Sequence, residues 1–273
     1  MTFLCETAEL TPVRPVKPAA AYFGGKCRLA KTIIEHIGAI PHDAYAEPFV
    51  GMGGVFLRRS ARPRAEIIND LSGDVANFFR VLQRHYIPFT EMLRFQLSGR
   101  LEFMRLAATD PKTLTDLERA ARFLYLQRLG FAGKIVDRAF AIKPDKAAYF
   151  DTGKLAPILA DLHERLSGVV IECLPYQEFI LRYDRPGTLF YLDPPYFGRE
   201  KQYEAGLFER KDFAALADLL RALKGRFILS LNDTPEVRKL FKGFHIASVP
   251  VTYNTNSATK RTHELLIANT ALA

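Results

Sequence analysis

The segment Asp193-Pro194-Pro195-Tyr196, which follows the apolar run 188–192, has the residue types needed to hold an amino group on a planar base. Such an amine is a poor nucleophile because its lone pair is delocalised into the ring. If the Asp193 carboxylate and the Pro194 carbonyl each accept one amine hydrogen, the lone pair becomes available to attack an electrophile. Pro195 keeps the turn rigid, and Tyr196 can stack on the base. We therefore expect these four residues to be catalytic.

The strands expected around this segment would place it at one edge of a sheet. An apolar strand that ends in a carboxylate presents it at the carboxyl edge, where open α/β sheets bind ligands. Residues 44–49 form a second expected strand, which breaks at a glycine-rich turn (51–54) and continues into a helix from Val55. Residues 65–70 form a third, which ends in Asp70. Gly51 precedes Asp70 by 19 residues, close to the roughly 20 typical of a nucleotide-binding βαβ unit.

The rest of the chain alternates strands and helices around a helical middle. Periodic apolar residues predict helices over 74–129, broken at Pro88 and at Asp110-Pro111, then a turn at 130–133 and a basic loop to Lys146. Further strands are expected at 169–171, 189–192, 227–230 and 265–267, with helices at 213–223 and 235–241. This order predicts an α/β sheet interrupted by a mainly helical insertion.

The overall composition limits the class of protein. The chain has 273 residues, a net charge of +8 and a pI near 9.4, a balance that favours a polyanionic partner. No apolar run is long enough for a membrane span, and the first 20 residues lack a signal-peptide pattern, so a cytoplasmic location is expected. Three scattered cysteines are too few for a disulfide framework or a zinc site.

Several motifs occur together in an order that resembles the Dam-type DNA adenine-N6 methyltransferases. The resemblance rests on Tyr22-Phe23-Gly24-Gly25-Lys26, on Glu47 to Leu57, on Asn69-Asp70-Leu71 and on Asp193 to Tyr196. It implies a Rossmann-like catalytic domain in two parts (1–74 and 150–273) around a helical target-recognition insertion (75–149). It also implies transfer of a methyl group from S-adenosylmethionine to N6 of an adenine that is flipped out of double-stranded DNA.

The resemblance assigns roles to particular residues. Gly51 and Gly53 would let the backbone approach the cofactor, Asp70 would bind its ribose hydroxyls, and Glu47 its amino group. Tyr22 and Lys26 would shape the methionine end, although Lys26 could instead contact a DNA phosphate. The complete expected cofactor set is Tyr22, Gly24, Gly25, Lys26, Glu47, Pro48, Phe49, Gly51, Gly53, Asp70, Leu71, Cys173, Tyr176 and Asp193. No metal is expected, and the oligomeric state stays open, with a monomer allowed.

Two departures from the family pattern concern specificity and cofactor affinity. Ala132 and Gln127 stand where relatives usually have asparagines that can read adenine, so no target site, GATC included, is predicted. Arg128, Lys134 and Arg138 are the expected DNA contacts. Pro175 stands where relatives commonly have an Asp that helps to hold the cofactor's adenine. Either Tyr176 and the Cys173 backbone suffice there, or cofactor binding is weaker.

Other activities are less compatible with the residues. Enzymes that methylate cytosine N4 usually have Ser in place of Asp193, and RNA adenine enzymes tend to have Asn there. Transfer to cytosine C5 needs a thiolate, usually within Pro-Cys, and no cysteine has that setting. A catalytically silent DNA-binding protein would need neither Asp193 to Tyr196 nor the turn 51–54. A role in restriction, in a phage or in chromosomal regulation is left undecided.

Overall fold

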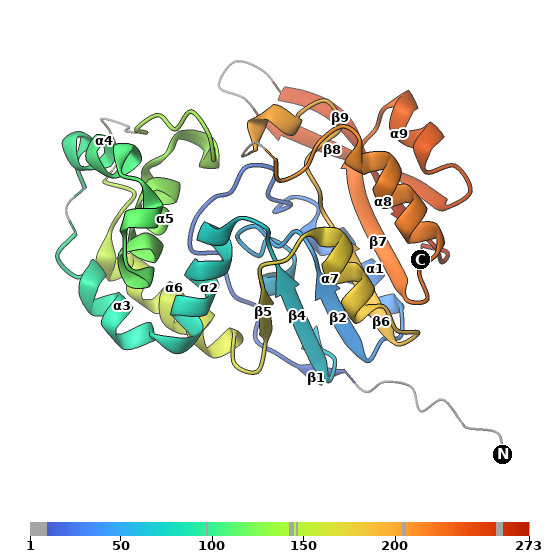
Figure 1. The fold of residues 1–273 in the computed structure, drawn as a ribbon, viewed down its shortest axis with the longest axis horizontal. Coiled ribbons are helices and arrows are strands. Elements are labelled where there is room, and N and C mark those ends of the chain that lie inside the picture. Colours follow the sequence, from blue (N-terminus) through green and yellow to red (C-terminus); the bar gives the residue numbers. More distant parts are fainter. Residues whose placement is uncertain are drawn as a thin grey trace.

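A central sheet of seven strands organises the part of the chain that the computed structural model describes, namely residues 10–96, 98–141, 145, 147–203, 206–254 and 259–272. The strand order is β5 (Val170–Glu172), β4 (Ala65–Asn69), β2 (Ala44–Glu47), β6 (Thr188–Leu192), β7 (Arg226–Asn232), β9 (Thr259–Ala268) and β8 (His245–Asn254). The strands from β5 to β7 are parallel, whereas β9 and β8 are antiparallel additions at one side. The predicted α/β class with a mostly parallel sheet is confirmed (Figure 1).

The parallel strands end together at one edge. Ala46 of β2 lies between Ile67 of β4 and Phe190 of β6 in the pairing register. All five residues of β6 are buried, which is why the sequence of this strand is a continuous apolar run instead of an alternating one. Because β4, β2 and β6 are adjacent and parallel, the residues that follow them meet at the same carboxyl edge.

Helices cover both faces of the sheet and create a core on each (Figure 1). One core contains Ile33 and Ile37 of α1 (Ala30–Ala39), packed with Tyr45 of β2. The other contains Phe179 and Phe213, from two helices on the opposite face. The helices near this second core are α7 (Tyr176–Tyr183), α8 (Asp212–Arg221) and α9 (Pro235–Leu240). Burial on both faces therefore fixes the strands whose ends carry polar residues.

In the sequence, a group of helices lies between β4 and β5. In space, this group forms the left side of Figure 1. It consists of α2 (Gly73–Arg84), α3 (Tyr86–Leu93), α4 (Arg100–Ala108), α5 (Asp116–Leu129) and α6 (Thr152–Arg165). Its core includes Phe78, Phe89 and Phe123, with ring centroids 5.7 to 6.2 Å apart around Phe78. A capping box of Thr115 and Glu118 starts α5. The insertion expected at 75–149 falls within this helical group, and its status as a separate domain stays a prediction.

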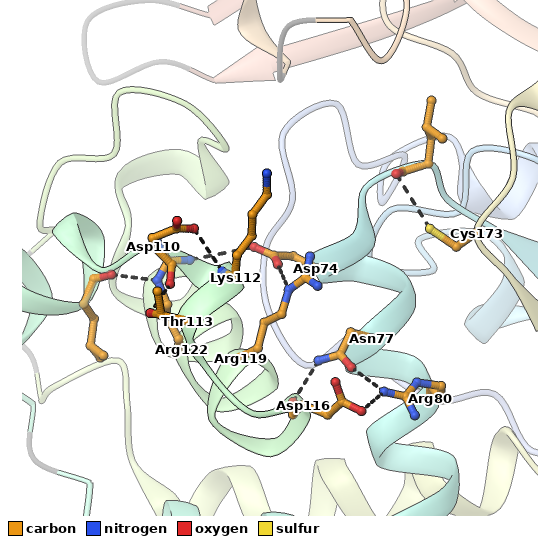
Figure 2. A network of polar contacts seen from close by, with 12 residues as sticks. Asp74, Asn77, Arg80, Asp110, Lys112, Thr113, Asp116, Arg119, Arg122 and Cys173 are labelled. Carbon is orange, nitrogen blue, oxygen red and sulfur yellow. Dashed lines mark hydrogen bonds and ion pairs between the residues drawn. The ribbon is translucent and has the colours of Figure 1, made fainter.

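Polar contacts attach α5 to the beginning of α2, as Figure 2 shows. The Arg119 guanidinium donates to Asp74 at 2.5 Å, and an Arg122 nitrogen lies 3.7 Å from the same carboxylate. The Asn77 amide donates to the Asp116 carbonyl at 2.8 Å. Since Asp74 lies shortly after the end of β4, these bonds anchor the helical insertion beside the sheet edge.

Some local predictions were wrong. The helix expected from Val55 is only a short 3₁₀ turn (η1, Phe56–Arg58), after which the backbone extends into β3 (Ala61–Arg62) and pairs with β1 (Thr11–Pro12). The extension follows from the Arg59 guanidinium, which is buried and pairs with Glu66 of β4 at 2.9 Å. Helices α1, α6 and α7 and strand β8 were not expected.

Pro88 does not break a helix as expected. It lies in the first turn of α3, where proline is tolerated, and the break between α2 and α3 falls at His85.

Across the described ranges, no helix is long and apolar enough to cross a membrane.

Candidate active site

Three acidic residues meet at the carboxyl edge of the sheet. Glu47 is the last residue of β2, Asp70 directly follows β4, and Asp193 directly follows β6. All three line one cavity. The other predicted site residues on its wall are Tyr22, Gly24, Gly25, Lys26, Pro48, Phe49, Gly51, Leu71, Tyr176 and Pro195. Gly53, Cys173, Pro194 and Tyr196 are not among the residues that line it.

Asp193 is held through one of its two carboxylate oxygens. Lys26 Nζ donates to Oδ1 at 2.5 Å, and Ser230 Oγ donates to the same atom at 3.0 Å. The Ser230 hydroxyl also shares a hydrogen bond of 2.9 Å with the Tyr191 hydroxyl. Among the residues that the structure describes, none donates a hydrogen bond to Oδ2. Burial raises the pKa of Asp193, while the charge of Lys26 opposes that shift.

The Lys26 ammonium lies inside the site instead of reaching solvent. Its side chain is only 3% exposed, and Nζ lies 4.5 Å above the centroid of the Tyr196 ring. It also approaches the Gly24 carbonyl at 3.4 Å and the carboxylate of Glu264 at 3.7 Å. Lys26 therefore connects the turn before α1 to the acid after β6.

Glu47 has a different set of partners from Asp193. The Tyr45 hydroxyl donates to Glu47 Oε2 at 2.6 Å, and the residue is almost fully buried. Burial, with a further contribution from the nearby charge of Asp193, raises the pKa of Glu47 to about 8. A buried acid of this kind favours a cationic ligand group, because a cation would compensate the ionised carboxylate.

Asp70 fixes the glycine-rich turn that follows β2. Its two carboxylate oxygens accept hydrogen bonds from the backbone N–H groups of Gly51 and Ser72, each at 2.9 Å. Gly51 has a φ of +50°, and a Cβ at this position would lie 2.8 Å from the Tyr22 ring. Only glycine fits this close packing, so the turn and Tyr22 form one wall of the cavity.

Aromatic rings line the opposite part of the cavity. The Phe49 ring lies 5.6 Å from Tyr176 and 5.7 Å from Phe208 between centroids. The Tyr176 hydroxyl donates to the Asp212 carbonyl at 3.3 Å. Pro175 precedes the first turn of α7, and its carbonyl accepts from the Phe179 N–H at 3.0 Å. These residues offer an apolar aromatic wall that suits a planar heterocycle.

Cys173 lies beside this region without facing it. Its thiol lies 3.8 Å from the Leu71 carbonyl, to which it donates (Figure 2). The next residue, Leu174, lines the cavity in its place. A cofactor contact through the Cys173 backbone stays a prediction.

Two asparagines that were not predicted as site residues hold the edge together. The Asn69 amide donates to the carbonyls of Pro48 and Leu174 at 2.9 and 3.0 Å and accepts from the Leu174 N–H at 2.8 Å. Asn232 binds both backbone groups of Phe197, at 2.9 and 3.1 Å, directly after Tyr196. A polar residue at the end of each apolar strand was the available signal in the sequence.

The recognition turn, which we define as residues 130–134, lies against the cavity wall. The Gly133 carbonyl accepts a hydrogen bond from the Phe23 N–H at 3.0 Å. Phe131 is 53% exposed, Lys134 is exposed, and Ala132 has the left-handed φ of +56°. This turn therefore presents an aromatic ring and a cation to solvent beside the site.

The residues just before the turn face the protein. Gln127 is buried, and its amide donates to the carbonyls of Ala21 and Gly133 at 3.0 and 3.2 Å. Arg128 donates to the Ala19 carbonyl at 2.6 Å and to the Tyr149 carbonyl at 2.9 and 2.7 Å. Gln127 therefore braces the recognition turn through Gly133, whereas Arg128 joins the segments around Ala19 and Tyr149. DNA contacts by Arg128, Lys134 and the half-buried Arg138 stay predictions.

The chain is similar to DNA methyltransferases over most of its length. Residues 22–255 match the family described as D12 class N6 adenine-specific DNA methyltransferase. A type II methyltransferase, M1.LlaDCHI of Lactococcus lactis subsp. cremoris, is 25% identical over 89% of this chain and 90% of its own length. The DNA adenine methylases of Haemophilus influenzae and Escherichia coli K12 are 26% and 24% identical, over 89% and 90% of this chain and 89% and 92% of their own lengths.

Similarity to solved structures is weaker. The chain resembles an RNA methyltransferase candidate from Pyrococcus horikoshii with a TM-score of 0.37 and 9% identity, over 88% of this chain and 79% of the other. No group of three or more potential metal ligands occurs within the described ranges. Because the family match covers most of the chain and includes the cavity, the chain belongs to the D12 class of N6 adenine-specific DNA methyltransferases.

Proposed function

We propose specific roles for the cavity residues in the reaction of this family, methyl transfer from S-adenosylmethionine to N6 of adenine in DNA. Asp193 Oδ2 and the Pro194 carbonyl would accept the two N6 hydrogens. The observation that carries this role is the fixation of Asp193 through Oδ1 alone, by Lys26 and Ser230. One oxygen then orients the carboxylate, and the other is available to the base.

The remaining cavity residues fit the cofactor. Its planar adenine would lie on the aromatic surface of Phe49, Tyr176 and Phe208. Asp70 lies beside the glycine turn, where a ribose would be reached, and the buried Glu47 suits the cationic amino group. When bound, S-adenosylmethionine supplies an electrophilic methyl group on a sulfonium.

The chain's own residues then act by positioning. The base must leave the duplex to reach a cavity at the sheet edge, and Tyr196 would stack on its face. Asp193 and Pro194 draw the N6 hydrogens so that the nitrogen lone pair points at the methyl group. Asn232 holds the segment after Tyr196 rigid through Phe197. Orientation of the reactants is the main contribution expected from such a site.

The recognition turn would lie against double-stranded DNA. Lys134 would neutralise a phosphate, and the exposed Phe131 ring would contact bases as an apolar side chain can. Arg138 would add a second cation, whereas Arg128 would have to exchange backbone bonds for a phosphate contact. The cytoplasmic location stays a prediction from the sequence, and the oligomeric state stays open.

The direct test is to sequence unmethylated DNA, with detection of modified bases, after incubation with the purified protein and S-adenosylmethionine. We expect N6-methyladenine. Modification within one short motif would name the target site, and modification at many unrelated adenines would indicate relaxed specificity. Methylated cytosine N4, methylation of RNA alone, or no modification would contradict the proposed roles.

A further inference from the structure

Lys26 lies between two carboxylates, only one of which the proposed reaction uses. Its Nζ is 2.5 Å from Asp193 Oδ1 and 3.7 Å from Glu264 Oε2. We propose that Glu264 is a positioning residue that shares the positive charge of Lys26, so that Asp193 is held in place without losing its strength as an acceptor for the adenine amine. This inference rests on the role proposed above for Asp193.

Glu264 occupies a position where an acidic residue is costly. It belongs to β9, it is 2% exposed, and the residues that follow it from Leu265 to Ala268 are buried apolar side chains. Its ladder partners are Asn232 of β7 and Val249 of β8. Burying a carboxylate in such a strand destabilises the fold unless a cation compensates it. The nearby ammonium of Lys26 provides that compensation. The same ammonium donates a hydrogen bond to Asp193, the acid proposed to hold the adenine amine.

The charge count explains why a second acid is useful. A lone ammonium at 2.5 Å from Asp193 would draw electron density from the carboxylate and weaken its hydrogen bonds to the base. With Glu264 Oε2 at 3.7 Å from Nζ, two carboxylates share the positive charge of Lys26, so Asp193 keeps more of its own negative charge. That charge favours both the incoming sulfonium cation and the positive charge that develops on N6 during attack.

Two residues from different elements of the fold contact Asp193. Ser230 Oγ approaches Oδ1 of Asp193 from β7, and Lys26 approaches the same oxygen from the turn before α1. Glu264 therefore acts through Lys26 and need not touch the substrate. Its removal should affect the chemical step, and it should leave the cofactor surface of Phe49 and Tyr176 unchanged.

The first experiment compares the rate of methyl transfer by Glu264→Gln with that of the wild-type protein under single-turnover conditions. The substitution keeps the shape and removes the charge. We expect the rate of methyl transfer to fall at least tenfold, while the Kd for S-adenosylmethionine changes less than twofold. Glu236→Gln, the same change at an exposed position of α9, is the matched control and should leave the rate unchanged. An unchanged rate in Glu264→Gln would overturn the inference.

A second experiment removes the cation that the two acids share. Lys26→Met should nearly abolish transfer, because the two buried carboxylates then face each other and one takes up a proton. In that background, adding Glu264→Gln should raise the rate, since it removes the negative charge of Glu264 from beside Asp193. If Glu264→Gln lowers the rate by the same factor with and without Lys26, Glu264 has a purely structural role and the inference fails.

Asp193→Ala separates this inference from the proposed function on which it rests. If Asp193→Ala keeps full activity, the proposed role of Asp193 itself is wrong. If Asp193→Ala is inactive but Glu264→Gln is fully active, only the inference about Glu264 is wrong.

Discussion

The sheet edge and the recognition turn lie next to each other and are built in opposite ways. At the sheet edge, Asp193, Lys26 and Ser230 are joined by hydrogen bonds among mostly buried side chains. At the recognition turn, Phe131 and Lys134 are exposed, and Ala132 holds a left-handed backbone. The edge is therefore held together by contacts within the protein, while the turn presents its side chains to solvent.

The two regions are nevertheless connected. Gln127 binds both Ala21 and Gly133, and the Phe23 N–H binds the Gly133 carbonyl. The residues that shape the cavity and the recognition turn are therefore joined through the backbone. If this division of labour is right, substitutions at the edge should change cofactor binding or chemistry, and substitutions at the turn should change DNA binding.

The largest binding effect is expected for Glu47→Gln at the cofactor end of the edge. A hydrogen bond to a charged group contributes about 1.5–3 kcal/mol, so the Kd for S-adenosylmethionine should rise about 10- to 100-fold. Titration calorimetry on the purified variant measures this change. An unchanged Kd would show that Glu47 does not bind the cofactor's amino group.

The raised pKa of Glu47 predicts that the free energy of unfolding depends on pH differently in the wild type and in Glu47→Gln. The folded protein keeps Glu47 protonated up to about pH 8, whereas the usual pKa is 4.5. The stability that this protonation gives is complete below pH 4.5 and is lost as the pH rises through about 8. Relative to Glu47→Gln, the wild type should therefore lose stability as the pH increases across this window. Denaturant unfolding at several pH values tests the sign, and a parallel pH dependence in both proteins would contradict it.

Ser230→Ala tests whether the hydrogen bond from Ser230 positions Asp193 for methyl transfer. Loss of its hydrogen bond to Asp193 should remove about 1 kcal/mol of positioning, which corresponds to a rate several-fold lower. Tyr191→Phe is the matched control, because it removes the bond between the two hydroxyls and leaves the one to Asp193. Single-turnover rates that fall equally in both variants would contradict a role for Ser230 through Asp193.

Lys134→Ala tests the recognition turn. Loss of one phosphate contact should lower the slope of log K for DNA against log salt by about one, with the rate at saturating DNA nearly unchanged. Lys239→Ala, at an exposed position of α9, should leave the slope unchanged. A slope that falls equally in both variants would show that the effect is not specific to the turn.

The smallest effect is expected for Ala132→Asn. Alanine is strained at a φ of +56°, while Asn tolerates the left-handed region, so the variant should be more stable by up to about 1 kcal/mol. Ala132→Val, with a β-branched side chain, should be less stable. Thermal unfolding of the two variants measures both signs. If both variants are less stable than the wild type, backbone strain at Ala132 does not reduce the stability of the folded protein.

The sequence pattern indicates that three acids lie at one sheet edge, and the reason is physical. Glu47, Asp70 and Asp193 each follow an apolar run, and parallel strands bring such residues to one edge. The contact between Lys26 and Glu264 could not be foreseen in this way, because it depends on how the antiparallel strand β9 pairs with β7. Short-range periodicity carries no information on that pairing.

The same limit applies to the helix that was expected after the glycine turn and to the position of Gln127. A helix after the glycine turn was expected from local pattern, but the buried pair of Arg59 and Glu66 extends the backbone instead. Gln127 was interpreted through its place in the motif, and only the packed structure shows that its amide is buried against Ala21. Long-range polar contacts decided both cases.

The most direct test of the account is methyl transfer by Asp193→Ala. In this variant Lys26 keeps Glu264 as a nearby acid, so the fold and the cofactor surface should persist. We expect no detectable N6-methyladenine at saturating S-adenosylmethionine and duplex DNA, with cofactor binding close to that of the wild type. Transfer at the wild-type rate would contradict the assignment of Asp193 as the acceptor that activates the base.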